Sequence, residues 1–254
     1  MKSPLTDDEA LVLYAKARLG DEAARKLLTD EAERGDKIAQ RYLGRIYDFE
    51  ARFYSTYDDS VEQASKQAAY WYRKAAEQGD AWAQNDLGTL YVNGLGVPQD
   101  YAQAVQWFRK AAEQGEPRAM LNLGWNYGGL GVPEDYAQAA QWFRKAVEQN
   151  DYDDSITRDA LSELCGLYEK GHGVPQSKVA AYALCTLSDD LARQLPEEAR
   201  IEDIEEANRA HRIRLDTEMT PQEIETAKKL VPKIDDAHLV FQSLDEYLKT
   251  QNKR

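Results

Sequence analysis

The residues best suited to chemistry are few and lie far apart along the chain. The three histidines, His172, His211 and His238, fall in different segments, and none has a cysteine, histidine or carboxylate at a metal-ligand spacing such as H-E-x-x-H. We therefore expect these histidines to be exposed or to lie in turns. The sequence predicts no metal site and no cofactor.

Other candidate motifs each lack a required residue. The segments 94–96 and 171–173 have the G-x-G pattern of a phosphate-binding loop, but no strand pattern precedes them and the third glycine is absent, so we interpret them as turns between helices. The acidic run 151–155 lacks the glycine and glutamate that a calcium loop would need at Ile156 and Ser162, which favours an acidic linker. No motif of nucleophilic catalysis is recognisable. We predict no catalytic residues and no enzymatic activity.

Composition and charge narrow the class of protein. The chain has 254 residues, which is long enough for one elongated domain or two compact ones. Of these residues 43% are hydrophobic, a fraction too high for a disordered chain. The net charge of −13 disfavours binding to nucleic acid. No apolar run of about 18 residues occurs, so we expect no membrane insertion. The first residues do not form a signal peptide, which predicts a cytoplasmic protein, or a periplasmic one if a signal has been removed.

A repeat accounts for most of the chain. Residues 80–115 read DAWAQNDLGTLYVNGLGVPQDYAQAVQWFRKAAEQG, and residues 116–150 nearly repeat them with one residue fewer. A related copy with an insertion occupies residues 36–79, and a fourth occupies residues 159–188. A repeat with a period of 35 to 36 residues is typical of a solenoid.

Each copy is predicted to be an antiparallel helical hairpin. Apolar and small residues recur at spacings of three and four on both sides of a glycine-rich turn, and Asp100 is placed to cap the second helix. Gly88, which recurs as Gly44 and Gly124, lies inside the first helix, where it costs about 1 kcal/mol relative to alanine. We expect it to allow close approach of the second helix through Ala104.

The segments around the repeats are predicted to be capping helices. Residues 1–35 resemble a shortened hairpin broken at Gly20, and residues 189–254 contain three helical stretches: 191–214, with a fresh start at Pro196, 220–230, opened by a Thr220 cap, and 235–249. The expected organisation is an N-terminal cap (1–35), four repeats (36–79, 80–115, 116–150 and 151–188) and C-terminal capping helices (189–254).

Two cysteines fall in the fourth copy. Cys165 takes the place of Gly88, and Cys185 takes the place of Phe108, so a bond between them is geometrically conceivable. The two positions otherwise hold a small and a large apolar residue, and free cysteines behave as small hydrophobic residues. We therefore expect two free, buried thiols.

The repeat pattern, A-x-A-Q-x-x-L-G-x-x-Y followed by G-x-G-V-P-x-D-Y-x-x-A-x-x-W-F-R-K-A-A-E-Q-G, resembles the Sel1-like repeats, relatives of the tetratricopeptide repeats. The resemblance covers about residues 36–188 and implies an all-α, right-handed α-solenoid that binds other proteins and has no family-wide catalytic activity. It also implies a finer possibility, because some bacterial members are immunity proteins that neutralise secreted antibacterial effectors. The chain departs from the pattern at Cys165 and at Leu184, which replaces the tryptophan of the other copies.

The concave face of such a solenoid is lined by the first helix of each hairpin. Positions two before and two after the repeat leucine are unconstrained by the motif, so we expect them to face a partner. In the four copies these are Arg41 and Arg45, Asn85 and Thr89, Leu121 and Trp125, and Ser162 and Gly166. Trp125 is the strongest candidate for an interface anchor and Trp82 a weaker one, although Trp125 is equally compatible with packing on a neighbouring helix.

An insertion near residues 48–59 adds aromatic residues to the first repeat. Phe49, Phe53, Tyr54 and Tyr57 are either part of a binding loop or part of an extra turn of helix, and the sequence favours neither. The leading hypothesis is thus a scaffold or adaptor that captures another protein, with a secreted effector as one possible partner. A hydrolase with an unrecognised site and a structural, oligomer-forming protein are the alternatives.

Overall fold

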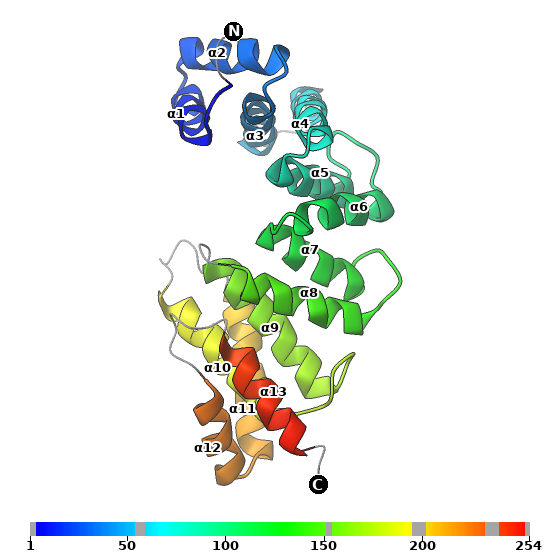
Figure 1. The fold of residues 1–254 in the computed structure, drawn as a ribbon, viewed down its shortest axis with the longest axis vertical. Helices are drawn as coiled ribbons and strands as arrows, with labels where there is room; N and C mark the ends of the chain where they lie inside the picture. Colours follow the sequence, from blue (N-terminus) through cyan, green and yellow to red (C-terminus); the bar gives the residue numbers. More distant parts are fainter. Residues whose placement is uncertain (1–3, 54–58, 151–153, 195–201, 232–238, 252–254) are drawn as a thin grey trace. The chain divides into compact units, whose positions relative to one another are not determined.

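The computed structural model describes residues 4–53, 59–150, 154–194, 202–231 and 239–251, and within these ranges every regular element is a helix (Figure 1). The fold class is all-α, as predicted. The chain divides into two compact units, Met1–Ala119 and Met120–Arg254, with the division inside helix α7 (Pro117–Tyr127). No helix among the described residues is both long enough and apolar enough to cross a membrane.

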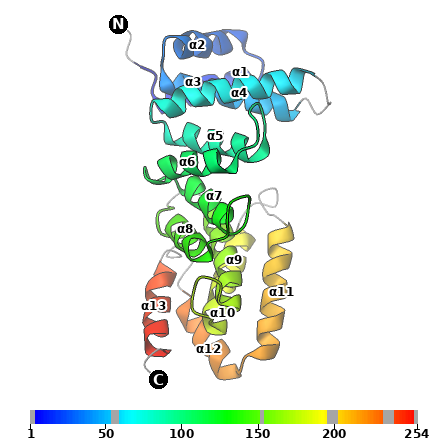
Figure 2. The same cartoon turned by 90° about the vertical axis from the view of Figure 1, so that its right-hand side faces the viewer.

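The first unit consists of stacked helical hairpins (Figure 2). Its helices are α1 (Asp7–Arg18), α2 (Glu22–Glu33), α3 (Lys37–Phe53), α4 (Asp59–Glu77), α5 (Ala81–Asn93) and α6 (Tyr101–Ala112), followed by the start of α7. From α1 to α6 each helix packs against the next, and α1 also packs against α3. The core of each hairpin therefore continues into its neighbour, as a repeat that cannot bury its apolar faces alone requires.

Local sequence signals set the ends of these helices. The side chains of Asp21, Asp80 and Asp100 each accept a hydrogen bond from a backbone amide in the first turn of α2, α5 and α6. Gly94 ends α5 in the left-handed conformation, with φ of 67°, which glycine adopts without steric cost. The predicted cap at Asp100 and the glycine-rich turn are both confirmed.

The helix glycines allow close approach of the two helices of a hairpin. A Cβ atom on Gly88 would lie 2.6 Å from the Phe108 ring, and one on Gly44 would lie 2.6 Å from the Tyr72 ring. The expectation of a close contact at Gly88 is thus confirmed, but the residue that fills the space is Phe108 and not Ala104. The buried ring needs the flat surface that a missing side chain provides.

The insertion lengthens the helices of the first repeat. Helices α3 and α4 have 17 and 19 residues, against 13 and 12 in α5 and α6. Residues 48–53 belong to α3, so for this part of the insertion the extra-helix interpretation holds. Tyr54 and Tyr57 lie outside the described residues, as does the side chain of Phe53.

In the part of the second unit that the structure describes, the remainder of α7 is followed by six further helices. These are α8 (Tyr136–Glu148), α9 (Asp154–Lys170), α10 (Lys178–Gln194), α11 (Glu202–Glu218), α12 (Pro221–Leu230) and α13 (Val240–Gln251). The predicted Thr220 cap is present, with its hydroxyl accepting a hydrogen bond from the backbone of Glu223. The predicted helix 191–214 is wrong at its start, because residues 191–194 continue α10, and Pro196 lies outside the described residues.

Helices α11 and α12 pack against α10 (Figure 2). This packing explains a departure from the repeat pattern. Leu184 on α10 is fully buried, whereas Trp107 and Trp142, at the same position of the second and third repeats, are partly exposed; Trp71 of the first repeat is 9% exposed. A partly exposed tryptophan is replaced by a smaller apolar residue where the outer face of the repeat lies in the protein interior.

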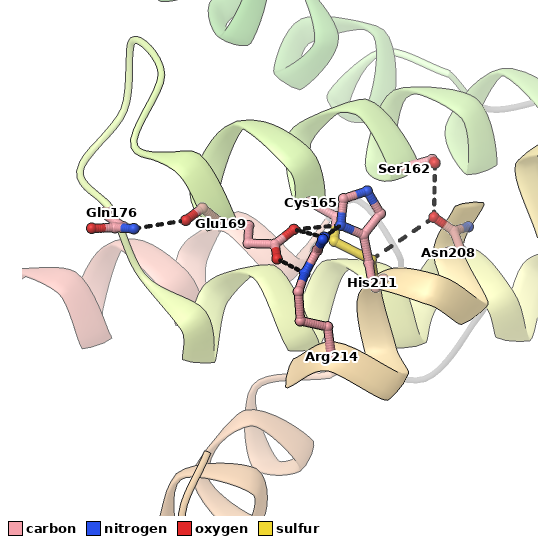
Figure 3. Close-up of polar contacts among 8 residues, drawn as sticks. Ser162, Cys165, Glu169, Gln176, Asn208, His211 and Arg214 are labelled. Carbon is pink, nitrogen blue, oxygen red and sulfur yellow. Dashed lines mark hydrogen bonds and ion pairs between the residues drawn. A yellow bond between two sulfur atoms is a disulfide. The ribbon is translucent and has the colours of Figure 1, made fainter. Parts of the chain in front are cut away.

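Cys165 and Cys185 form a disulfide that joins α9 to α10, with their Cα atoms 5.5 Å apart (Figure 3). The expectation of two free thiols is therefore wrong. The disulfide forms because the repeat places position 165 against position 185, just as it places Gly88 against Phe108 in the second repeat. Two cysteines at positions in direct contact are close enough to be bonded.

Candidate functional site

The first unit contains a cavity of about 310 Å³ lined mainly by the first helices of its hairpins. Helices α3 and α5 supply most of the lining, with contributions from α1, α4 and the start of α7. The lining residues are Tyr14, Arg45, Asp48, Phe49, Arg52, Tyr72, Trp82, Asn85, Asp86, Thr89, Leu90, Glu116 and Arg118. Four of these residues are aromatic and six are charged. Binding sites usually lie in concave parts of a protein surface.

Arginine side chains stack on aromatic rings along this surface. The guanidinium group of Arg18 lies 4.0 Å from the ring centre of Phe49, and that of Arg45 lies 5.0 Å from Tyr14 and 5.5 Å from Tyr42. Such contacts hold the rings and the charges in fixed positions. The surface is therefore organised before any partner binds.

Five of the residues predicted to bind a partner line this one cavity: Arg45, Phe49, Trp82, Asn85 and Thr89. The side chain of Trp82 is 41% exposed, which is unusual for a tryptophan and leaves part of its ring available for contact. The structure thus brings together residues from the first repeat, its insertion and the second repeat. Their role in binding remains a prediction.

The expectation that positions two before the repeat leucine point into an open groove is wrong for three of the four copies, whereas Ser162 in the fourth is partly exposed. Arg41, Asn85 and Leu121 are all at least 94% buried. Arg41 shows why, because it pairs with Asp7 and donates a hydrogen bond of 3.1 Å to Asp80 at the start of α5. The position two before the leucine lies one helical turn before the position two after it, and there the next hairpin covers the side chain. The positions two after the leucine, Arg45 among them, are partly exposed.

Asp86 is the functional candidate that the sequence argument missed. It lies one residue before the repeat leucine Leu87, faces the cavity and accepts a hydrogen bond of 3.2 Å from the Asn85 amide. Burial raises the pKa of its carboxyl group to about 6, and the positive charge of Arg45 opposes that shift only in part. Comparing the position before the leucine across the repeats would have indicated it, because that position is polar in three copies.

In the second unit, Trp125 lies on α7 and is partly exposed, as expected for the position two after the leucine. Its indole Nε1 donates a hydrogen bond of 2.9 Å to the carboxylate of Glu163 on α9. Partial burial raises the pKa of Glu163 above its usual value, and the Trp125 hydrogen bond counteracts the shift. Trp125 thus contacts the neighbouring first helix and also keeps exposed surface. One part of the Trp125 side chain therefore packs on a neighbouring helix, and another part is exposed and available to a partner.

A polar cluster joins α9 to α11 beside the disulfide (Figure 3). Glu169 accepts hydrogen bonds from Arg214 and contacts Nδ1 of His211, so His211 is neither in a turn nor fully exposed. Burial alone would raise the pKa of the Glu169 carboxyl group, but its hydrogen bonds with Arg214 and His211 hold that pKa below its usual value. His211 has an acidic partner, as a catalytic base would.

The nucleophile that a hydrolase would need is not directed at His211. The hydroxyl of Ser162 donates a hydrogen bond of 2.8 Å to the Asn208 side chain on α11 (Figure 3). The Asn208 amide in turn donates to the hydroxyl of Ser188. Among the described residues no hydrogen bond links Ser162 to His211. A serine hydrolase requires that contact for proton transfer. The cluster is therefore explained by the packing of α11 on the fourth repeat.

Comparison with known proteins gives the class to which this arrangement belongs. The family model of the Sel1 repeat matches residues 37–80, 83–116, 117–151 and 158–188, which together make up more than half of the chain. The chain belongs to the Sel1 repeat family. Sel1 repeats generally act as protein–protein interaction modules on a non-catalytic scaffold.

Two solved structures with this fold are similar to the chain. A protective antigen of uropathogenic Escherichia coli with an SLR fold is 27% identical with a TM-score of 0.67, over 98% of this chain and 49% of that protein. A Sel1 repeat protein from Oxalobacter formigenes is 25% identical with a TM-score of 0.58, over 89% of this chain and 98% of that protein. The chain spans about half the length of the E. coli protein. No curated protein matches the chain.

Proposed function

We propose that this protein is a scaffold or adaptor that captures a partner protein in the concave cavity of its first unit. The observation that carries the proposal is the cavity itself, in which first helices present Trp82, Thr89 and Arg45 together. Tryptophan and arginine are the residues that most often dominate the energy of protein interfaces. The fixed stacking of arginine on aromatic rings lowers the entropy cost of binding.

Affinity capture from cells that express the protein tests this proposal. The wild-type chain is compared with Trp82→Ala and with Tyr70→Ala as a matched control, because Tyr70 on α4 is similarly exposed at 49% and does not line the cavity. We expect Trp82→Ala to lose the partner and Tyr70→Ala to keep it. Equal recovery with both variants would contradict the proposal.

The finer proposal is that the partner is a secreted antibacterial effector and that the protein confers immunity to it. This proposal rests on the family resemblance and on the cavity of the first unit. Co-expression with a toxin encoded by a neighbouring gene tests it, with cell survival as the measurement. Protection by wild type and its loss with Trp82→Ala is the expected result, and a toxin neighbour against which the protein gives no protection would contradict it.

The disulfide supports a proposal about the compartment in which the protein works. Disulfides persist in oxidising compartments such as the bacterial periplasm and are rare in the cytosol. We therefore propose that the protein works in an oxidising compartment, which agrees with the periplasmic alternative of the sequence analysis and not with the cytoplasmic one. Alkylation of free thiols in separated cell fractions tests this proposal. Fully reduced Cys165 and Cys185 in freshly trapped cells would contradict it.

A further inference from the structure

Asp86 is a charged group inside the cavity that the chain itself leaves poorly compensated. Among the described residues, only the Asn85 amide donates a hydrogen bond to its carboxyl group, and no cation lies within ion-pair distance of it. A second carboxylate of the cavity, Asp48, is paired with Arg52 at 3.1 Å. A carboxylate with one neutral donor in a desolvated position has the most to gain from a cation.

The charged and titratable groups around Asp86 come from three neighbouring helices. Arg45 and Asp48 on α3, Tyr72 on α4 and Arg118 on α7 all interact with it electrostatically. The two arginines favour the ionised carboxyl group and Asp48 disfavours it, but burial is the largest influence and raises its pKa to about 6. Asp86 is therefore mostly ionised at pH 7 to 8 and mostly protonated at pH 5.

The walls of the cavity fit a planar cation. Trp82 borders the cavity with part of its ring exposed, and the chain already stacks guanidinium groups on rings at this surface, as Arg18 does on Phe49 at 4.0 Å. A volume of about 310 Å³ is large enough for one long side chain. The net charge of −13 attracts a basic partner from a distance.

We propose that the cavity accepts an arginine side chain of the partner protein, with Asp86 accepting hydrogen bonds from its guanidinium group and Trp82 packing against it. This inference rests on the proposed function and specifies the residue that the groove recognises. Arginine suits the site because its fork of donors can pair with both oxygens of one carboxylate and because it stacks on aromatic rings.

An acidic side chain is the competing occupant, since three arginines also line the cavity. Arg52 is already paired with Asp48, and Arg45 is stacked on Tyr14 and Tyr42. A carboxylate placed beside them would also lie near the negative charge of Asp86. Glu116 and Arg118 complete the lining, in which three arginines and three carboxylates balance in formal charge. The pairing of Arg52 with Asp48 and the stacking of Arg45, and not the net charge of the lining, therefore favour a cation beside Asp86.

Titration of the full chain with short blocked peptides tests the proposal. The probes are acetyl-Gly-Arg-Gly-amide, the same peptide with citrulline, which keeps the shape of arginine without its charge, and the same peptide with glutamate. Binding is followed by chemical shifts of the tryptophan indole groups. At pH 8 we expect the arginine peptide to bind at least about tenfold more tightly than the other two, as charge-assisted hydrogen bonds require.

Two variants and a pH series locate the interaction. Asp86→Asn should weaken binding of the arginine peptide by about tenfold or more, whereas Asp30→Asn, which removes a carboxylate of α2 outside the cavity, should leave it nearly unchanged. Asparagine is tolerable at this position because the third repeat has Asn122 there. For wild type, lowering the pH from 8 to 5 should weaken binding about tenfold, because protonation of Asp86 must then be reversed.

Each contrary result has a definite meaning. Equal affinity for the citrulline peptide, an unchanged affinity of Asp86→Asn, preference for the glutamate peptide, or no binding of any peptide would overturn the proposal. The pH series and the citrulline comparison use wild type, so they decide the matter even if a variant fails to fold. If Trp82→Ala loses the partner while Asp86→Asn keeps it, the groove function stands and the arginine assignment fails.

Discussion

The second and fourth repeats solve the same packing problem in different ways. In the second repeat, the ring of Phe108 fills the space left by Gly88, and the contact between these two positions is non-covalent. In the fourth, Cys165 and Cys185 occupy the same two positions and are covalently bonded. The comparison shows that one helix contact of the repeat accepts either a glycine with an aromatic ring or a disulfide.

The surroundings of the two hairpins explain the difference. Helix α6 of the second repeat keeps a partly exposed outer face, whereas α10 of the fourth lies under α11 and α12. The fourth repeat ends the regular array and is bordered by segments outside the repeat pattern. A covalent link there restricts the unfolded chain and does not depend on a neighbouring repeat for its stability.

Removal of the disulfide is expected to have the largest effect. The bond closes a loop with a sequence separation of 20, for which loop-closure entropy gives a contribution of about 3 kcal/mol to stability. The variant Cys165→Ala/Cys185→Ala should lose about this amount in urea unfolding. Reductant should destabilise wild type similarly and leave the variant unaffected. Identical unfolding of wild type with and without reductant would show that the fourth repeat does not depend on its bond.

The variant Gly88→Val tests the non-covalent form of the contact. Its Cβ would lie 2.6 Å from the Phe108 ring, so overpacking should cost about 2–3 kcal/mol. Gly166→Val is a matched control, because Gly166 also lies within a helix, α9, but a Cβ there would have no atom within 4 Å. Thermal unfolding should separate the two variants. Equal melting temperatures would show that the glycine contact is not tightly packed.

Asp86→Asn is expected to stabilise the folded chain at high pH. The folded-state pKa of about 6 lies above the ordinary value of 3.8, so the cost of ionising Asp86 is absent below pH 3.8 and fully present above pH 6. At pH 8 the variant should be more stable than wild type by about 1–3 kcal/mol, and at pH 4 the difference should nearly vanish. Urea unfolding at the two pH values measures it. A difference independent of pH would show that desolvation of Asp86 is not its source.

Trp125→Ala is expected to have the smallest effect on stability. The residue is partly exposed, and its hydrogen bond to Glu163 lies at the surface, so the cost should be about 1–2 kcal/mol. Phe143→Ala should cost about 3–5 kcal/mol, because Phe143 is 98% buried against Gly124. Comparison of the two unfolding curves tests this. If Trp125→Ala is as unstable as Phe143→Ala, Trp125 is a core residue and not a candidate for partner contact.

The sequence by itself determined the features that depend on short-range geometry. The repeat period and the spacing of apolar residues predicted the helical hairpins, and Asp100 and Thr220 marked the helix starts, because a cap depends only on residues within one turn. The alignment of the repeats also indicated the close helix contact at Gly88. It also aligned Cys165 with Cys185, and only the judgement that the pair would stay free was wrong.

The tertiary structure decided which side chains of the first helices are buried and which are available to a partner. Arg41 and Arg45 lie four residues apart on α3, yet Arg41 is covered by its contact with Asp80 of the next hairpin and Arg45 borders the cavity. Helix periodicity assigns both to similar faces and cannot separate them, because the difference comes from how the next repeat is stacked. The desolvation of Asp86 has the same origin, since its environment is built from α3, α4 and α7 as well as its own helix.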